Sequence, residues 1–273
     1  MKIMVTGASG MLGQDLCPIL EDIGVFVIPT NSSILDITDK NAAENFIQNA
    51  HPDIIIHCAA YTNVDKAQSD SENAYKINRD GTRNIAIAAD KINALMIYIS
   101  TDYVFDGTKN TPYTPKDKTN PQNVYGSSKL AGEQEVIKHC KKYYIARTSW
   151  LYGHKGKNFV ETMISLAQKP ELKVVDDQTG CPTWTVALCR AVIKLISEQK
   201  PYGIYHTCGG GYTSWYGFAK EIFKLAGINA NLKPCTTDEF PRDAKRPKFS
   251  VMDNDGICPD WKLSLKEYIE MRG

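Results

Sequence analysis

The chain has 273 residues, of which 42% are hydrophobic and 23% charged, and its formal net charge is +1. These values are ordinary for a globular protein with one large domain, or with a core domain and a smaller addition. They argue against a partner that is nucleic acid or an anionic membrane, and no apolar run reaches the ~20 residues of a membrane span.

The first predicted element is a strand over residues 2–6. No basic region with an apolar segment precedes it, so no secretory signal is visible. The eight cysteines form no Cys-x-x-Cys pair, and most lie in apolar runs, where cysteine acts as a small hydrophobic residue. Both observations predict a cytoplasmic protein with reduced thiols, and they favour buried cysteines over a zinc or other metal site.

Three glycines follow this strand at Gly-x-x-Gly-x-x-Gly spacing: Gly7, Gly10 and Gly13. Between a strand and a helix, the first permits a tight turn, the second lets the backbone approach a pyrophosphate, and the third lets the helix pack on the strand. Phosphates would then meet free N–H groups at the positive end of the helix dipole. A plain glycine turn is the alternative, but the strand-to-helix context favours a phosphate site.

The end of the second predicted strand bears on the choice of cofactor. Dinucleotide folds often carry an acidic residue there, which holds the adenosine ribose. Residues 30–33 read Thr-Asn-Ser-Ser, with neither a carboxylate nor a basic side chain. NADH and NADPH therefore both stay open. Asp36 and Ile37 could reach the adenine, although Asp36 could instead be a turn residue before the next helix.

Short apolar runs alternate with helical patterns along the first half of the chain. The predicted strands are 2–6, 25–29, 53–57, 94–100 and 143–147, and the predicted helices are 11–23, 39–50, 71–92 and 124–142. Apolar strands separated by helices are typical of a parallel sheet covered on both faces. The order predicts an α/β fold with a doubly wound parallel sheet, the Rossmann arrangement.

Tyr125 and Lys129 form a Tyr-x-x-x-Lys pattern on the last of these helices. Positions i and i+4 share one helix face, so both side chains can reach one site. Bringing a tyrosine from a pKa of ~10 to near 7 needs roughly 4 kcal/mol, and a charge ~4 Å away supplies a similar amount at an effective dielectric near 20. Lys129 is therefore expected to help lower the pKa of the phenol, with burial opposing the shift and the positive nicotinamide ring of a bound cofactor adding to it. Alone, such a pair would more often be an exposed tyrosine and lysine.

Thr101 and Asp102 follow the strand predicted over 94–100. Ligands of a doubly wound sheet bind outside the carboxyl ends of its strands, which places both residues beside the cofactor. A hydroxyl, a phenol and an ammonium next to a glycine cradle predict a site for carbonyl reduction. The alternative for Thr101 is a simple cap at the end of the strand.

After Thr148 the pattern changes, with longer loops, a glycine cluster and several prolines. The further predicted elements are the strands 172–175 and 203–206 and the helices 185–197 and 214–226. We interpret residues 1–150 as an NAD(P)-binding Rossmann domain and 151–273 as a smaller, mainly substrate-binding domain that is partly interleaved with it. The strand at 172–175 is expected to return to the Rossmann sheet.

Taken together, these motifs resemble the extended short-chain dehydrogenases/reductases, and within them the dTDP-4-dehydrorhamnose reductase family. The resemblance covers nearly the whole chain. It is carried by the segments 6–13, 35–39, 59–66, 100–105, 123–133, 147–150, 177–183 and 246–247.

The resemblance implies a role for most of the residues named above. The cofactor, NADPH or NADH, would be bound by Gly7, Gly10, Met11, Leu12, Gly13, Asp36, Ile37, Ala59, Ala60, Tyr61, Ser100, Tyr125 and Lys129. Tyr125 would be the proton donor, with Lys129 as its partner and Thr101 near the carbonyl oxygen. The substrate would be bound by Thr101, Asp102, Trp150, Gln178 and Arg246, the last two at its nucleotide half.

Two departures from neighbouring patterns are informative. Nucleotide-sugar dehydratases carry Thr-Asp-Glu after the fourth strand, whereas Tyr103 stands at the Glu position here; a ketone reduction does not need that carboxylate. Some reductases of this family dimerise around a metal held by glutamates, but Asp15 occupies one such position, and residues 184–187 offer no carboxylate. We therefore expect a monomer or a weak homodimer.

The predicted function is the NAD(P)H-dependent reduction of the C4 ketone of dTDP-4-dehydro-L-rhamnose, for cell-surface polysaccharide synthesis. Two alternatives stay open. One is a reductase of another nucleotide sugar. The other is a non-catalytic NADP-binding regulatory subunit of the methionine adenosyltransferase type, since fold alone does not fix function.

Overall fold

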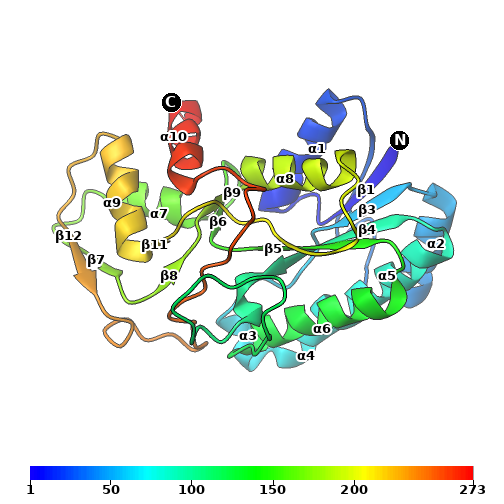
Figure 1. Ribbon diagram of the computed structural model, residues 1–273, viewed down its shortest axis with the longest axis horizontal. Helices are drawn as coiled ribbons and strands as arrows, with labels where there is room; N and C mark the ends of the chain where they lie inside the picture. Colours follow the sequence, from blue (N-terminus) through cyan, green and yellow to red (C-terminus); the bar gives the residue numbers. More distant parts are fainter. Residues whose placement is uncertain (273) are drawn as a thin grey trace.

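A computed structural model describes residues 1–272, and its centre is a six-stranded parallel sheet (Figure 1). The strand order is β10-β5-β4-β3-β1-β2, and all five neighbouring pairs are parallel. The strands are β1 (Lys2–Thr6), β2 (Phe26–Thr30), β3 (Ile54–His57), β4 (Leu95–Thr101), β5 (Tyr143–Thr148) and β10 (Gly203–His206). The doubly wound Rossmann fold predicted from the sequence is confirmed.

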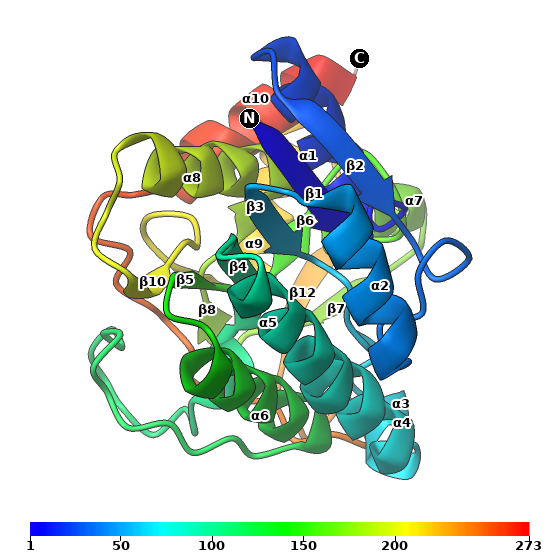
Figure 2. The ribbon, with the colours of Figure 1, turned by 90° about the vertical axis from the view of Figure 1, so that its right-hand side faces the viewer.

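Helices cover both faces of this sheet, as Figure 2 shows. They are α1 (Met11–Asp22), α2 (Lys40–Ala50), α3 (Lys66–Ser69), α4 (Ser71–Tyr75), α5 (Thr82–Lys91), α6 (Val124–His139) and α8 (Thr185–Ser197). Alternate strand residues pack on opposite layers: Val5 and Ile56 contact the α1 and α8 side, whereas Met4 and Ile55 contact α2, α5 and α6. Burial on both faces explains why these strands are apolar throughout.

The helix predicted over 71–92 is divided into three parts. A π-helical turn, Lys76–Gly81, lies between α4 and α5. Such turns inside helices often occur at functional sites. Lys76 and Ile77 of this turn line the central cavity described below.

The remaining elements form a second lobe around its own aromatic core. They are β6 (Leu151–Tyr152), α7 (Phe159–Leu166), β7 (Leu172–Val175), β8 (Thr179–Gly180), β9 (Thr183–Trp184), β11 (Thr213–Ser214), α9 (Trp215–Leu225), β12 (Leu232–Cys235) and α10 (Trp261–Arg272). Side chains of α7, α9 and α10 pack together there, among them Phe218, Trp261 and Tyr268. No helix within residues 1–272 is long and apolar enough to cross a bilayer.

The expectation that strand 172–175 returns to the Rossmann sheet is wrong. That strand, β7, pairs with β12 in a separate two-stranded sheet, and β10 is the strand that joins β5. The reason is visible in the burial of β7, where Leu172 and Val174 are buried but Lys173 is exposed. A strand with one charged face suits a sheet covered on a single side.

Candidate active site

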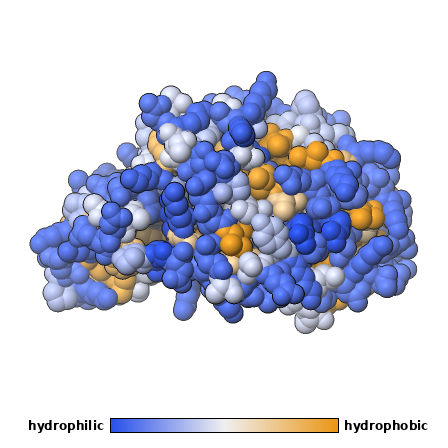
Figure 3. Space-filling view, turned by 90° about the horizontal axis from the view of Figure 1, so that it is seen from below, coloured by the Kyte–Doolittle hydropathy of each residue, from blue (hydrophilic) through white to orange (hydrophobic). Residues whose placement is uncertain are grey.

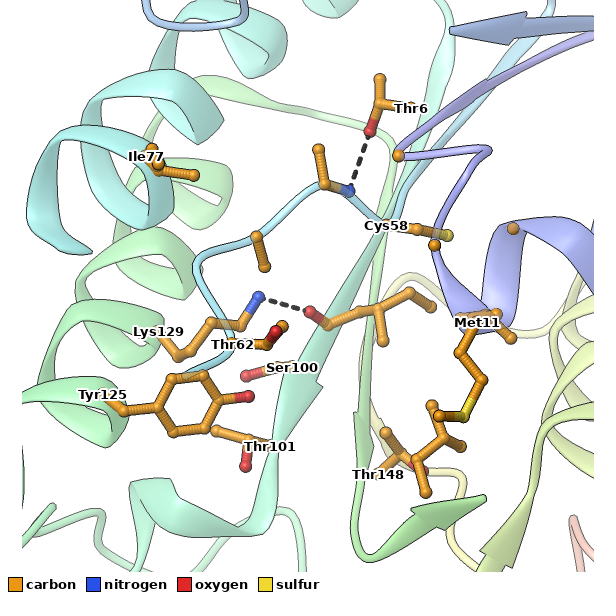
Figure 4. A pocket seen from close by; sticks show the side chains of 18 of the residues that line it. Thr6, Met11, Cys58, Thr62, Ile77, Ser100, Thr101, Tyr125, Lys129 and Thr148 are labelled. Atoms are coloured by element: carbon orange, nitrogen blue, oxygen red, sulfur yellow. Dashed lines mark hydrogen bonds between the residues drawn. The ribbon is translucent and has the colours of Figure 1, made fainter. Parts of the chain in front are cut away.

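A cavity of about 900 Å³ opens at the carboxyl ends of β1, β3, β4 and β5 (Figure 4). Both lobes contribute to its wall. The predicted site residues that line it are Gly7, Gly10, Met11, Leu12, Gly13, Asp36, Ile37, Ala59, Ala60, Ser100, Thr101, Asp102, Tyr125, Lys129 and Trp150. Segments far apart in the sequence therefore meet in one place, as expected for a parallel sheet.

The glycine cradle has the geometry that a pyrophosphate needs. Gly7 has a φ of +65°, and a Cβ on it would lie 2.7 Å from the backbone N of Ala59. A Cβ on Gly13 would lie 2.5 Å from Ala8 Cα, so only glycine lets α1 sit this close to the turn. Within residues 1–272, no side chain caps α1 and no acidic residue lies in its first turn. Its N–H groups and positive dipole end are thus available to an anion.

The part of the cavity beside the end of β2 has residues that could contact an adenosine. Asp36 accepts hydrogen bonds from the Thr38 backbone N (2.9 Å) and Oγ1 (2.8 Å), and these bonds hold the pKa of its carboxyl below the usual value. Thr30 and Asn31, at the end of β2, are neutral cavity residues. Lys76, which the sequence analysis did not single out, also lines the wall there. Lys76 lies 46 residues after Thr30 in the sequence, so no local pattern linked it to this part of the cavity.

Tyr125 and Lys129 project from the start of α6. Asn123 caps this helix, its Oδ1 accepting the backbone N–H of Gly126 at 2.8 Å. In Figure 4 the phenol of Tyr125 points toward Ser100 and Thr101 at the end of β4. The Lys129 ammonium donates to the Ile99 carbonyl at 2.7 Å. Thr101, Tyr125 and Lys129 thus share one wall of the cavity, one helical turn separating the last two.

The pKa of Tyr125 differs from the sequence-based expectation. Burial raises it to about 12, although the neighbouring Thr101 hydroxyl opposes the rise. Burial also lowers the pKa of Lys129 to about 7, with the Glu133 charge acting in the opposite direction. The opposing effect of burial thus dominates in the structure, where the Lys129 ammonium donates to the Ile99 carbonyl. Tyr125 is accordingly a protonated phenol at neutral pH.

Glu133 is a residue that the sequence analysis missed. Its carboxylate accepts hydrogen bonds from Ser100 Oγ (2.6 Å), Arg147 Nε (2.9 Å) and Arg147 Nη2 (2.7 Å), and all three side chains are buried. A signal was present, because Tyr125, Lys129 and Glu133 follow one another at four-residue spacing on one face of α6.

Asp102 lines the cavity, but one of its carboxylate oxygens is buried without a hydrogen-bond partner in the described part of the chain. Its Oδ1 accepts a hydrogen bond from Thr101 Oγ1 at 3.1 Å, but its Oδ2 is buried with no partner among the described residues. Burial raises the pKa of this carboxyl to about 6. A buried acceptor without a partner is costly, and the buried Ser250 hydroxyl, which opposes the rise in the pKa of Asp102, is the candidate donor within this chain.

Three predicted residues do not line the cavity. Tyr61 donates its hydroxyl to Asp70, and Gln178 donates from Nε2 to Thr237 Oγ1 at 2.9 Å. Arg246 lies behind the wall residue Tyr103 and pairs through both terminal nitrogens with Asp65, with Nη2 at 2.8 Å from Oδ2. The guanidinium of Arg246, expected at the nucleotide half of the substrate, is therefore occupied by a carboxylate of the same chain.

Known proteins resemble this chain over its whole length. The family model for the RmlD substrate binding domain matches residues 1–271. The spore coat polysaccharide biosynthesis protein SpsK of Bacillus subtilis is 41% identical over 99% of this chain and 98% of its own length.

Two solved structures show the same architecture. A dTDP-4-dehydrorhamnose reductase of Clostridium acetobutylicum superposes with a TM-score of 0.97 at 50% identity, over 100% of this chain and 99% of its own. The Bacillus anthracis reductase, solved in complex with NADP, gives a TM-score of 0.96 at 41% identity, over 99% of each chain. With the family model, these identities show that the chain belongs to the dTDP-4-dehydrorhamnose reductase family of extended short-chain dehydrogenases/reductases.

Proposed function

We propose that this protein reduces the C4 ketone of dTDP-4-dehydro-L-rhamnose with NAD(P)H, giving dTDP-L-rhamnose for cell-surface polysaccharide synthesis. The proposal rests on one observation: the glycine cradle and the side chains of Thr101, Tyr125 and Lys129 line the same cavity. The similarity to reductases of this name, one of them in complex with NADP, and to SpsK supports it.

The residues at the cradle fit a dinucleotide. The first turn of α1 would bind the pyrophosphate through the N–H groups near Met11, Leu12 and Gly13. Asp36 and Ile37 would contact the adenine, and Ala59 and Ala60 would flank the rest of the molecule. When bound, the dinucleotide supplies the hydride.

The chain itself would supply the proton. The buried phenol of Tyr125 is protonated at neutral pH, which is the form that a ketone reduction requires of a general acid. Thr101, next to it, would turn its hydroxyl from Asp102 Oδ1 to the carbonyl oxygen and hold that oxygen within reach of the phenol. Lys129 would contact the cofactor ribose, and a charge there would stabilise the phenolate left after proton transfer.

The sugar would bind between the two lobes. Asp102 and the indole of Trp150, which both line the cavity, would contact the sugar. Gln178 and Arg246 were expected at the nucleotide half. Neither residue lines the cavity in the described structure, and direct contact through the guanidinium would require Arg246 to leave Asp65.

We further propose that the chain acts in the cytoplasm as a monomer or weak homodimer. The sequence pattern of the cysteines, with no Cys-x-x-Cys pair, supports this location. The oligomeric proposal is supported by Asp15, whose carboxylate accepts a hydrogen bond from Thr185 of the same chain. Figure 3 shows one face of the molecule, which is mostly hydrophilic and carries small groups of apolar residues.

Reduction of the named substrate is the first test. The purified protein, given NADPH and dTDP-4-dehydro-L-rhamnose, should consume NADPH and form a product that co-elutes with dTDP-L-rhamnose. The same assay with UDP- or GDP-linked 4-keto sugars is the matched comparison. Consumption of NADPH with one of those sugars, and none with the dTDP sugar, would contradict the proposed substrate.

Cofactor choice should be weak. Because residues 30–33 carry no charge, we expect Kd for NADPH and NADH to differ by less than about tenfold, or ~1.4 kcal/mol. Fluorescence titration of both nucleotides measures this ratio, and Lys76→Met reports how much the cation near Asp36 contributes. A preference above roughly a thousandfold, ~4 kcal/mol, would mean that another residue recognises the 2′ position.

A further inference from the structure

Trp150 adopts a backbone conformation that a large side chain rarely takes. Its φ is +46°, in the left-handed region, directly after β5. A residue other than glycine stays in that region only where its surroundings hold it there, and such residues cluster at functional sites. The contacts of the Trp150 indole therefore show what holds it.

Two residues hold this indole. The ring of Trp215 stacks on it with a centroid distance of 3.5 Å and an interplanar angle of 7°. The backbone of Gly180 packs directly on it, because a Cβ at Gly180 would lie 2.5 Å from Cε2, 2.6 Å from Nε1 and 2.8 Å from Cζ2 of the indole. Any residue larger than glycine at position 180 would displace the ring.

Both contacts come from one small ribbon of the second lobe. Strand β11 pairs antiparallel with β8, which sets Thr213 opposite Gly180. Trp215 follows as the first residue of α9, and Phe159 of α7 supports it with a centroid distance of 4.6 Å. The position of the Trp150 indole is thus set by the second lobe, although its backbone belongs to the Rossmann half.

We propose that Trp215 is a positioning residue for substrate, which with Gly180 holds the Trp150 indole against the cavity. Trp150 and Trp215 both line the cavity, as do Thr101 and Asp102. Affinity for the sugar end of a dTDP-linked 4-keto sugar depends on this stack, whereas affinity for the cofactor does not. This inference rests on the proposed function.

Kinetics of three variants test the stack. Trp215→Ala should raise KM for dTDP-4-dehydro-L-rhamnose at least about tenfold, with kcat changed less and Kd for NADPH within about twofold. Trp215→Phe keeps an aromatic face and should recover most of the loss. Gly180→Ala, at a residue whose φ is outside the left-handed region, should raise KM by pushing the indole from the other side.

The control is Tyr212→Ala, which removes an aromatic side chain that is 57% exposed, three residues before Trp215 and outside the cavity wall. It should leave KM unchanged. Near-ultraviolet circular dichroism gives a readout that is independent of activity, because two indoles stacked face to face are expected to couple. That signal should be present in the wild type and in Tyr212→Ala, and lost in Trp215→Ala and Trp215→Phe.

The two hypotheses fail in different ways. A wild-type protein that binds NADPH but neither binds nor reduces the dTDP sugar contradicts the proposed function. A wild-type protein that does both, alongside a Trp215→Ala variant with unchanged KM and a lost dichroism signal, overturns the inference alone. A normal KM in Gly180→Ala would also overturn it.

Discussion

Tyr125→Phe should lower kcat by at least about 100-fold while Kd for NADPH changes little. The phenol is buried, its pKa is about 12, and it faces Thr101, so its hydroxyl is a proton source beside the end of β4. Phenylalanine keeps the ring and its edge-on contact with Tyr103, whose ring centroid lies 5.8 Å from that of Tyr125. The loss should therefore report the missing proton rather than a change of packing.

Tyr103→Phe is the matched control, since it removes a second phenol hydroxyl from the same cavity wall. It should remain at least about ten times more active than Tyr125→Phe, as expected if only one hydroxyl transfers the proton. Single-turnover measurements with saturating NADPH separate the chemical step from cofactor binding. Turnover like that of the wild type in Tyr125→Phe would remove this residue from the mechanism and leave Asp102 as the nearest alternative acid.

The Rossmann half was predictable because its signals are local. The run from Lys2 through Gly13 contains a strand, a turn that only glycine permits and the start of a helix, and each part specifies the next. Strand 172–175 was misplaced because an apolar run does not state its partner. Pairing between β7 and β12 joins residues 60 apart in the sequence, and periodicity carries no information about such a distance.

The candidate site was predictable where a motif spans one element and not where the fold assembles it. Tyr125 and Lys129 share one helix, so their spacing placed them together. Trp215 reaches the cavity only because β11 pairs with β8, and Arg246 is diverted by Asp65, which lies 181 residues away in the sequence. These contacts depend on how the lobes pack, and no local pattern encodes them.

The buried ion pair beneath the site should have the largest effect on stability. Glu133 and Arg147 lie between α6 and β5, and their side chains are 1% and 3% exposed. Removing one partner of such a pair leaves a buried charge unpaired, which typically costs about 3–5 kcal/mol. We therefore expect Glu133→Gln to lower the free energy of unfolding by roughly that amount. Arg147 is already short of acceptors, because its Nη1 has no hydrogen-bond partner within residues 1–272. Loss of the Glu133 charge would therefore leave the guanidinium without compensation.

Urea denaturation with and without NADPH measures this effect, and the exposed pair Arg190–Glu267 provides the control. Glu267→Gln removes a carboxylate that is 51% exposed and should cost less than about 1 kcal/mol. The double variant Glu133→Leu with Arg147→Met removes both charges, so it should be more stable than Glu133→Gln. Equal losses in the buried and exposed single variants would contradict the idea that an unpaired Arg147 is the source of the cost. If Glu133→Gln is costly but the double variant is no more stable, the interaction with Ser100 would be the remaining explanation, and Ser100→Ala would reproduce the effect of Glu133→Gln.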